Sequence, residues 1–297
     1  MKIGLSANPT KPLAVELARR AIDRLEGRAD LVLATETRAA IGNGARKLAE
    51  GPLEQMAADA VVSIGGDGTF LWTLQRTTLP VLPINAGTVG FLAEVDGSQA
   101  AAFDGALERL LRGFYFVEER MKLASQAGKV QLPDATNEIV VHTSHVAKMR
   151  LFEIGVDNRP VGRIRADGVI LGTPTGSTSY SLSALGPIID PGLEAIVITA
   201  LAPFQTTQRA VLIDPLRTVS VRLVHPEKPG VVVVDGQSET SLTGGATVLA
   251  YRSPRRAAFI RFGSRFFRRL QGKKILPWSE DSVDAEGNDD AALPSSS

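Results

Sequence analysis

Two segments combine residue types that could bind or activate a phosphorylated ligand. The first is Gly65-Gly66-Asp67-Gly68-Thr69, which directly follows the apolar run 61–64. Glycines let the backbone turn sharply and bring N–H groups close to a phosphate. A phosphate would repel the carboxylate of Asp67, so its presence suggests metal binding or proton abstraction. The alternative is that Asp67 only caps a following helix, with Thr69 in its first turn.

The second segment is Gly172–Tyr180, where five serines and threonines surround two glycines. Hydroxyls and free N–H groups that converge in one turn suit a polar ligand such as a dinucleotide. A turn that caps the next helix is the competing interpretation. The segment is not a Walker loop, because Ser177 stands where that motif has its lysine. A Rossmann Gly-x-Gly-x-x-Gly motif is also absent from the sequence.

Three shorter pairs or triplets are ambiguous when taken alone. Asn137-Glu138 could hold a ribose, because a carboxylate accepts hydrogen bonds from vicinal hydroxyls and an amide both donates and accepts. It could equally be a polar strand end. Asp167-Gly168 and Asp235-Gly236-Gln237 are each consistent with a simple turn. The spacing of His142 and His145 does not suit one face of a strand, so we expect no metal site from these histidines.

The first hundred residues alternate between strand-like and helix-like segments. Strands are expected at 2–7, 31–33, 61–64 and 81–84, and helices at 15–25, 39–56, 70–77 and 103–112. This alternation predicts an α/β domain with an open, mainly parallel sheet and helices on both faces. Because ligands of such sheets bind at the carboxyl ends of the strands, the Gly65–Thr69 loop is well placed for a site.

The second half of the chain predicts an all-β domain. Short strands are expected at 121–127, 129–131, 138–142, 148–156, 161–164, 169–172, 195–200, 210–213, 218–223, 231–234, 247–251 and 257–261. The expected division of the chain is 1–104, 105–255, a C-terminal segment 256–278 and a tail 279–297.

Composition and charge narrow the class of protein. The 297 residues are 44% apolar, contain no cysteine and carry a net charge of +1. The sequence contains no run of 18 apolar residues that would predict a membrane helix. Because it also lacks cysteine, we expect a cytoplasmic protein. The tail 279–297 holds six acidic residues and no basic one, and it is expected to be disordered. The stretch 252–274 carries nine basic residues, but without a nucleic-acid motif we expect no nucleic-acid partner.

In combination these segments resemble the NAD kinase family. The order of motifs matches: Gly65–Thr69, 90–95, 118–121, Asn137-Glu138, Asp167-Gly168, 173–180 with Ser183, 186–188 and Asp235–Gln237. The resemblance spans roughly residues 1–270. The Gly-Gly-Asp-Gly-Thr sequence alone is shared with lipid kinases, whereas the Thr-rich segment preceded by Asn-Glu and Asp-Gly is specific to NAD kinases.

The resemblance implies a two-domain fold whose C-terminal segment packs back on the first domain, and roles for individual residues. Asp67 corresponds to the catalytic aspartate. The residues that would contact the phosphates or the dinucleotide are Gly66, Gly68, Thr69, Asn137, Glu138, Arg165, Asp167, Thr178, Ser179, Tyr180, Ser183 and Gln237. In the family the aspartate at Asp167 often reaches the adenine of a neighbouring subunit. Members with arginine at the position of Arg165 often prefer NAD over NADH, and we expect that preference here.

The implied reaction is transfer of the terminal phosphoryl group of ATP or polyphosphate to the 2′-hydroxyl of the adenosine ribose of NAD. The implied cofactor is Mg²⁺ or another divalent cation, and the implied assembly is a homo-oligomer, a dimer or a tetramer. Two alternatives remain at this stage. A lipid or diacylglycerol kinase would share the glycine loop but needs an apolar acceptor groove. A non-enzymatic dinucleotide sensor would not need Asp67.

Overall fold

The computed structural model describes residues 1–42, 48–88, 90–263, 266–273 and 275, which form two compact units. Met1–Phe262 form the first unit, and Gly263–Ser297 form the second, whose described part contains helix α6 (Phe266–Gly272). The predicted tail, 279–297, lies outside the described residues. None of the described helices is long and apolar enough to cross a membrane.

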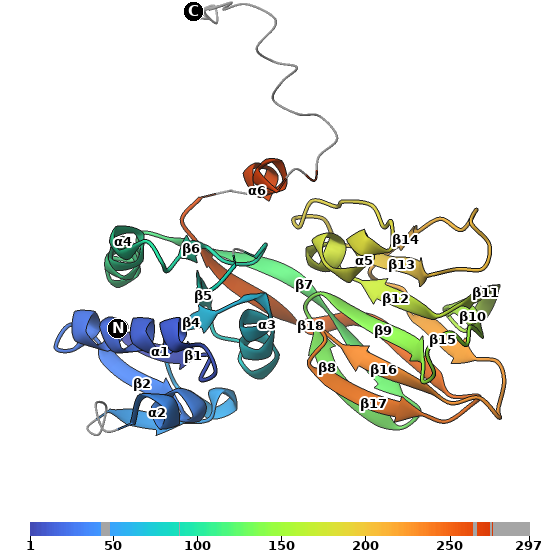
Figure 1. The fold of residues 1–297 in the computed structure, drawn as a ribbon, viewed down its shortest axis with the longest axis horizontal. Coiled ribbons are helices and arrows are strands. Elements are labelled where there is room, and N and C mark those ends of the chain that lie inside the picture. The colour runs from blue at the N-terminus through green and yellow to red at the C-terminus, as the bar shows by residue number, and fades with distance from the viewer. Residues whose placement is uncertain (43–47, 89, 264–265, 274, 276–297) are drawn as a thin grey trace, which may run out of the picture. The chain divides into compact units, whose positions relative to one another are not determined.

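The elements of the first unit alternate up to residue 111 and are mostly strands thereafter (Figure 1). The helices are α1 (Pro12–Leu25), α2 (Thr35–Ile41), α3 (Asp67–Arg76), α4 (Ala100–Leu111) and α5 (Tyr180–Ser183), with short 3₁₀ turns at Leu53–Gln55 and Thr175–Thr178. The strands are β1 (Lys2–Ala7), β2 (Asp30–Ala34), β3 (Ala49–Gly51), β4 (Ala60–Gly65), β5 (Val81–Asn85), β6 (Val95–Asp96), β7 (Phe116–Ala127), β8 (Val130–Ala135), β9 (Glu138–Thr143), β10 (Arg150–Val156), β11 (Arg159–Ala166), β12 (Gly168–Gly172), β13 (Ile196–Leu201), β14 (Val211–Ile213), β15 (Val219–Leu223), β16 (Gly230–Val234), β17 (Ser238–Leu242) and β18 (Thr247–Arg261).

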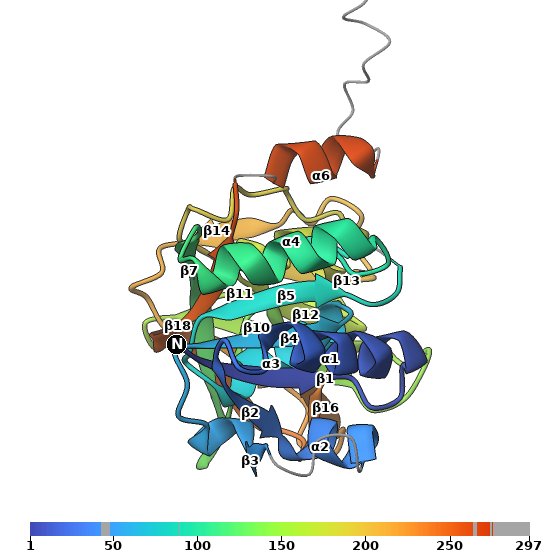
Figure 2. The ribbon, with the colours of Figure 1, turned by 90° about the vertical axis from the view of Figure 1, so that its left-hand side faces the viewer.

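The N-terminal half contains the predicted parallel sheet. Its strands run in the order β3-β2-β1-β4-β5, and every neighbouring pair is parallel. Helices α1 and α4 lie together over one face of this sheet (Figure 2). Helix α3 packs on the other face through Phe70, Leu71 and Leu74. The strand order reverses direction between β1 and β4, so a crevice is expected at the carboxyl ends of these two strands.

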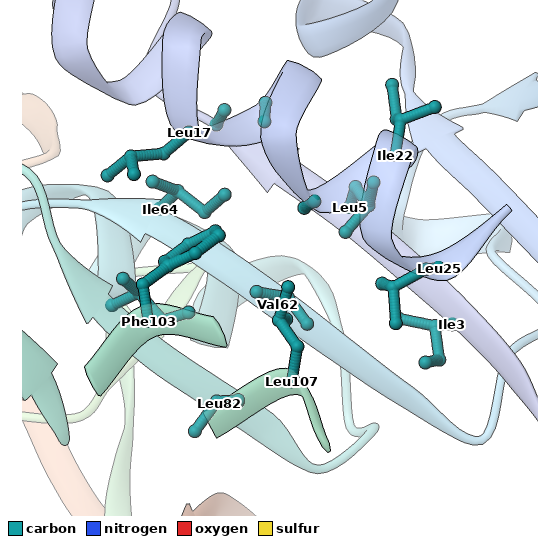
Figure 3. Close-up of a cluster of buried hydrophobic side chains, with 14 of the residues drawn as sticks. Ile3, Leu5, Leu17, Ile22, Leu25, Val62, Ile64, Leu82, Phe103 and Leu107 are labelled. Carbon is teal, nitrogen blue, oxygen red and sulfur yellow. The ribbon is translucent and has the colours of Figure 1, made fainter. Parts of the chain in front are cut away.

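An apolar stripe on α1 explains why this helix covers the sheet. Pro12 occupies the first helical turn, where its missing N–H costs no hydrogen bond. Leu17, Ile22 and Leu25 follow at helical spacing and are buried. Figure 3 shows these side chains meeting residues of β1, β4, β5 and α4, among them Ile64 and Phe103. This core holds the strand ends that precede the glycine loop.

Strand β18 joins the two halves of the first unit. It pairs with β7 in antiparallel fashion from Val248 to Arg261 and with β5 in parallel fashion at Phe259–Val81. The result is one 12-stranded sheet, against which a six-stranded sheet of order β14-β13-β12-β9-β16-β17 packs through a second apolar core. The predicted fold class, an α/β part followed by an antiparallel β part, is confirmed.

Several segments differ from the element predictions. The weak helix expected at 39–56 is α2, which ends at Ile41, followed after the undescribed residues 43–47 by β3 and a 3₁₀ turn. The two strands expected at 247–251 and 257–261 are the single strand β18, interrupted by a bulge between Arg252 and Arg256. Strand β17 was not expected, because its sequence, Ser-Glu-Thr-Ser-Leu, is mostly polar and lies at a sheet edge.

Candidate active site

A cavity of about 490 Å³ opens where the parallel sheet reverses its strand order. Its walls come from the segments that follow β1, β2 and β4, from α3 and from the turn after β16. The lining residues are Ser6, Ala7, Asn8, Pro9, Lys11, Glu36, Thr37, Gly66, Gly68, Thr69, Trp72 and Gln237. The amide of Asn8 donates to Thr69 Oγ1 at 3.1 Å and so ties the first turn of α3 to the end of β1. We call this space the first cavity.

Asp67 is the first residue of α3, and its carboxylate is held by a neighbouring loop. Oδ2 accepts a hydrogen bond from the Phe91 N–H at 2.8 Å, and Oδ1 accepts one from the Leu92 N–H at 3.2 Å. A Cβ at position 90 would lie 2.0 Å from Oδ1, so only glycine lets this loop approach the carboxylate. Asp67 is half-buried and is not among the residues that line the first cavity.

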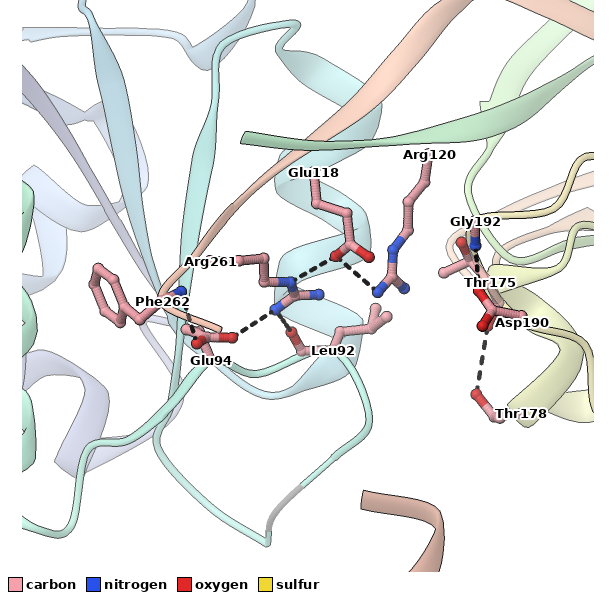
Figure 4. A network of polar contacts seen from close by, with 10 residues as sticks. All are labelled: Leu92, Glu94, Glu118, Arg120, Thr175, Thr178, Asp190, Gly192, Arg261 and Phe262. Atoms are coloured by element: carbon pink, nitrogen blue, oxygen red, sulfur yellow. Dashed lines mark hydrogen bonds and ion pairs between the residues drawn. The ribbon is translucent and has the colours of Figure 1, made fainter. Parts of the chain in front are cut away.

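A buried ion-pair network anchors the loop that holds Asp67 (Figure 4). Arg261, at the end of β18, donates from Nη1 to the carbonyl of Leu92 at 2.9 Å and lies 3.3 Å from a Glu94 carboxylate oxygen. Its Nε donates to Glu118 at 2.8 Å, and Arg120 donates to the same Glu118 oxygen at 2.9 Å. Arg261 and Glu94 are only 3% exposed. The network therefore connects β7 and β18 to the backbone that contacts Asp67.

A second cavity of about 410 Å³ lies between α3 and the six-stranded sheet. Its lining residues are Leu71, Asn137, Glu138, Val140, His142, Ser179, Tyr180, Val231, Val233, Asp235 and Gly236. Helix α3 and the turn after β16 contribute to both cavities, because Thr69 and Gln237 line the first while Leu71 and Gly236 line the second. The structure thus brings four of the predicted dinucleotide residues, Asn137, Glu138, Ser179 and Tyr180, to one space.

The turn after β16 positions the Asn137-Glu138 pair. Asp235 has a positive φ of 51°, and its buried carboxylate accepts hydrogen bonds from the N–H groups of Thr136, Asn137 and Glu138 at 2.8–3.0 Å. The Thr-rich loop approaches from the other side, where a Cβ on Gly176 would lie 2.2 Å from the carbonyl oxygen of Asn137. Glycine at position 176 is therefore required for this close packing.

Glu138 occupies surroundings that disfavour its charged form. Burial and the nearby Asp235 carboxylate raise the pKa of Glu138 to about 8, although hydrogen bonds from Ser179 and the Tyr180 N–H oppose the shift. Burial also raises the pKa of Asp235, against its three backbone hydrogen bonds. Glu138 Oε2 and Asn137 Oδ1 are buried and have no hydrogen-bond partner. Unpaired buried oxygens are costly, so both atoms are suited to receive a ligand hydroxyl.

Four other predicted residues do not line either cavity. Arg165 is exposed, and its guanidinium lies over the Phe204 ring at 5.1 Å. Asp167 is half-buried, and its Oδ1 has no hydrogen-bond partner. Thr178 donates to the Thr175 carbonyl at 3.4 Å, and Ser183 is exposed at the end of α5.

The sequence analysis did not identify Asn8 or Lys11 as site residues. It also did not predict that the carboxylate of Asp235 holds the backbone of Asn137 and Glu138. The signal for Asp235 was its place in an Asp-Gly turn after a buried strand, which also predicts the left-handed backbone found there. The signal for Asn8 and Lys11 was their place after β1, beside the strand that leads into the glycine loop.

Within the described ranges no group of three or more histidine and acidic side chains forms a ready metal site. Mg²⁺ in phosphoryl-transfer sites is often held by one or two carboxylates together with substrate phosphates. The carboxylate of Asp67 fits such a partial role, because two backbone N–H groups use only part of its capacity as an acceptor.

Comparisons with known proteins cover most of the chain. Residues 3–115 match the model of the ATP-NAD kinase N-terminal domain, and residues 136–262 match the ATP-NAD kinase C-terminal domain. An NAD kinase from Methanothermobacter thermautotrophicus is 39% identical over 291 residues, which cover 95% of this chain and 99% of the relative. An NAD kinase from Methanopyrus kandleri is 43% identical over 223 residues, 74% of this chain and 78% of the relative.

Two solved structures share the fold. An NAD kinase from Archaeoglobus fulgidus in complex with ATP has a TM-score of 0.74 at 29% identity, over 92% of this chain and 98% of that one. Yeast NADH kinase complexed with NADH has a TM-score of 0.84 at 21% identity, over 94% of this chain and 88% of that one. At that identity the yeast structure supports the fold alone.

Proposed function

Since the chain belongs to the NAD kinase family and is a phosphotransferase acting on NAD, we propose that its two neighbouring cavities hold the two reactants. The observation that carries this proposal is that α3 and the turn Asp235–Gln237 contribute residues to both cavities. Donor and acceptor bound there would meet at the N-terminus of α3, where Asp67 lies.

The second cavity is the proposed acceptor site. Asn137 Oδ1 and Glu138 Oε2 are buried and unpaired, and the hydroxyls of the adenosine ribose, which both donate and accept, would form hydrogen bonds with them. Ser179 and Tyr180 line the same space and would contact the dinucleotide. Thr178 and Ser183 belong to the same loop and helix, and we retain them as proposed contacts at its edge.

The first cavity is the proposed donor site. The first N–H groups of α3 have no partner inside the helix, and a helix N-terminus favours negative charge. Gly66 and Gly68 leave this backbone accessible, and Thr69 and Gln237 add polar side chains. The A. fulgidus relative was solved with ATP, which supports a nucleotide as the donor here. Polyphosphate remains the second candidate donor, because the same contacts would bind any chain of phosphates.

Asp67 is the proposed catalytic residue. In the reaction the ribose 2′-oxygen forms a bond to the terminal phosphorus, and the bond from that phosphorus to the bridging oxygen of the donor breaks. A carboxylate near the acceptor would take the proton that the hydroxyl loses. A divalent cation bound with the donor would neutralise phosphate charge, and the Asp67 carboxylate, at the first residue of α3, would help hold it.

Neither Arg165 nor Asp167 lines either cavity, which leaves both side chains available for contacts across a subunit interface. We propose a homo-oligomer in which Asp167 reaches the adenine of a neighbouring copy and Arg165 supports the preference for NAD over NADH. Light scattering on the purified chain measures the oligomeric state. A monomer with full activity would contradict this part of the proposal. A cytoplasmic location is proposed on the same family basis.

The direct test is product analysis. The purified chain is incubated with Mg²⁺ and either ATP or polyphosphate, in the presence of NAD, NADH or diacylglycerol. We expect NADP from NAD, less product from NADH and none from the lipid. The comparisons support neither the lipid kinase nor the dinucleotide sensor. Phosphorylated lipid, or no NADP with either donor, would contradict the proposal.

A further inference from the structure

Lys11 is the single basic residue among those that line the first cavity. Its ammonium group lies against the glycines of two different loops. A Cβ on Gly66 would be 3.2 Å from Lys11 Nζ, and a Cβ on Gly87 would be 2.9 Å from it. Position 66 belongs to the loop after β4, and position 87 follows β5. The charge therefore lies where the carboxyl ends of β1, β4 and β5 meet.

The turn after β1 explains how Lys11 comes to this place. The Asn8 N–H donates to the Ile64 carbonyl at 2.9 Å, which fixes the turn against the end of β4. Asn8 Oδ1 accepts hydrogen bonds from the N–H and the hydroxyl of Thr10, at 2.9 and 2.8 Å. The Lys11 N–H donates to the Asn8 carbonyl at 3.3 Å, and α1 begins at the next residue. The backbone of Lys11 is thus held on both sides.

The Lys11 ammonium has no ion-pair partner within the described ranges. The cavity lining contains one carboxylate, that of Glu36, which is exposed at the start of α2 and does not pair with Lys11. A half-buried cation beside the N-terminal N–H groups of α3 creates a site that favours a multiply charged anion. Glycines at 66 and 87 keep side chains out of the space around this cation.

We propose that Lys11 binds the terminal phosphates of the phosphoryl donor and supplies the positive charge that the glycine loop lacks. This inference rests on the proposed use of the first cavity as the donor site. Transfer of a phosphoryl group needs compensation of charge on its oxygens, and a lysine ammonium provides a compact point charge for them. The ligand class is a chain of at least two linked phosphates, either in a nucleotide or in inorganic polyphosphate.

The first test measures donor binding in variants of Lys11. Lys11→Met keeps the length of the side chain and removes its charge, whereas Lys11→Arg keeps the charge. Titration calorimetry gives the Kd of ATP with Mg²⁺, of inorganic tripolyphosphate and of NAD for each protein. We expect Lys11→Met to weaken binding of both phosphate ligands by about tenfold or more, in line with a lost charged hydrogen bond. Lys11→Arg should restore most of it, and NAD binding should change less than twofold.

A second variant tests the position of the charge rather than its presence. In Gly87→Ala the new methyl group would meet the flexible end of Lys11 at 2.9 Å and displace the ammonium without a clash with backbone. The fold should persist, because position 87 is exposed and its φ is not in the left-handed region. We expect donor affinity to fall by about threefold to tenfold while the charge remains. The matched control for Lys11→Met is Lys129→Met, which removes an exposed lysine from the turn between β7 and β8.

The outcomes separate this inference from the proposed function. Donor affinities of Lys11→Met within twofold of the parent protein would overturn the role of Lys11, even if the parent converts NAD to NADP. A parent protein that makes no NADP but binds tripolyphosphate through Lys11 would contradict the function and leave the anion site standing. Equal losses in Lys11→Met and Lys129→Met would show a general charge effect and overturn the inference.

Discussion

At the scale of single residues, the protonation of Glu138 is the clearest consequence of the site's construction. A carboxyl group whose pKa is about 8 in the folded chain, against 4.5 for an ordinary glutamate, is mostly protonated at neutral pH. The folded chain therefore holds a proton that the unfolded chain has released between these two values. Linkage then requires the stability of the fold to decrease as pH rises through this range.

Glu138→Gln should remove this pH dependence. Between about pH 5 and pH 8 the Glu138 contribution lowers the free energy of unfolding by up to about 1.4 kcal/mol per pH unit. The glutamine variant should therefore gain stability relative to the parent as pH rises, which thermal melts at pH 6 and pH 9 measure. Glu239→Gln, at an exposed position of β17, is the control and should show no such gain. A Glu138→Gln variant whose melting temperature differs equally from the parent at both pH values would contradict the raised pKa.

Residue-level reasoning from the sequence located Asn137, Glu138 and Asp67 but not their surroundings. The Asn-Glu pair precedes a strand, and its chemistry for a ribose could be recognised from residue types alone. The raised pKa depends on burial and on the carboxylate of Asp235, which is distant in sequence and meets the pair at the β16–β17 turn. Lys11 was missed for the same reason, because its two glycine neighbours belong to loops after different strands.

At the scale of elements, the end of strand β18 contacts the loop that holds Asp67. The strand ends at Arg261, which donates to the Leu92 carbonyl, while the Leu92 N–H donates to Asp67. Movement of this strand end would therefore move a hydrogen-bond donor of the Asp67 carboxylate, the proposed catalytic group. The burial of Arg261 and Glu94 makes the connection rigid, because separation of a buried ion pair costs several kcal/mol.

Arg261→Lys should lower kcat more than it weakens substrate binding. The single nitrogen of a lysine cannot occupy the positions of both Nε and Nη1 of Arg261, so some of these contacts are lost and the 91–92 backbone should shift while both cavities remain. We expect a loss of about 1–3 kcal/mol in stability from the broken hydrogen bonds. We also expect kcat to decrease by about tenfold or more, the effect of a small misplacement of a catalytic group. The KM for NAD should stay within about threefold of the parent value.

Arg255→Lys is the matched control on the same strand. Its guanidinium pairs with Asp134 at 2.9 Å, on β8 rather than on the 91–92 loop. Its kcat should remain close to that of the parent protein. If Arg261→Lys lowers kcat no more than Arg255→Lys does, the connection to Asp67 has no role in the reaction.

The elements themselves were partly predictable. Apolar runs followed by helical periodicity correctly predicted the parallel sheet, because buried parallel strands are apolar on both faces. The continuity of β18 could not be predicted, since the polar residues 252–256 interrupt its apolar pattern at the bulge. Strand β17 buries one apolar side chain, Leu242, and is otherwise held by pairing with β16, so its sequence has little apolar signal.

At the scale of the whole molecule, charge is distributed unevenly along the chain. Without the six acidic residues of 279–297, the remaining 33 basic and 26 acidic residues give a net charge of about +7. A positive body attracts anionic substrates such as ATP and NAD at long range. The sequence of the acidic tail contains no periodic pattern of apolar residues that could form a hydrophobic core.

Truncation after Glu280 should therefore leave the enzyme intact. We expect the kcat for NAD and the melting temperature to stay within experimental error of the full chain. Assays at low and high salt compare the two proteins, because any contribution of the tail to substrate attraction decreases with ionic strength. A large decrease in either quantity after truncation would show that the tail docks on the rest of the protein.

The central claim for the whole molecule is that two cavities bind the reactants and Asp67 acts between them. Asp67→Asn tests it most directly, since both cavities keep their lining residues. The variant loses one acceptor for the 91–92 backbone, which should cost about 1–2 kcal/mol in stability. Its kcat and its equilibrium dissociation constants for NAD and ATP are the quantities to measure. We predict a decrease in kcat of about 10²–10⁴-fold, with both dissociation constants within about threefold of the parent values. A near-normal kcat, or loss of binding of either reactant by a folded variant, would contradict the account.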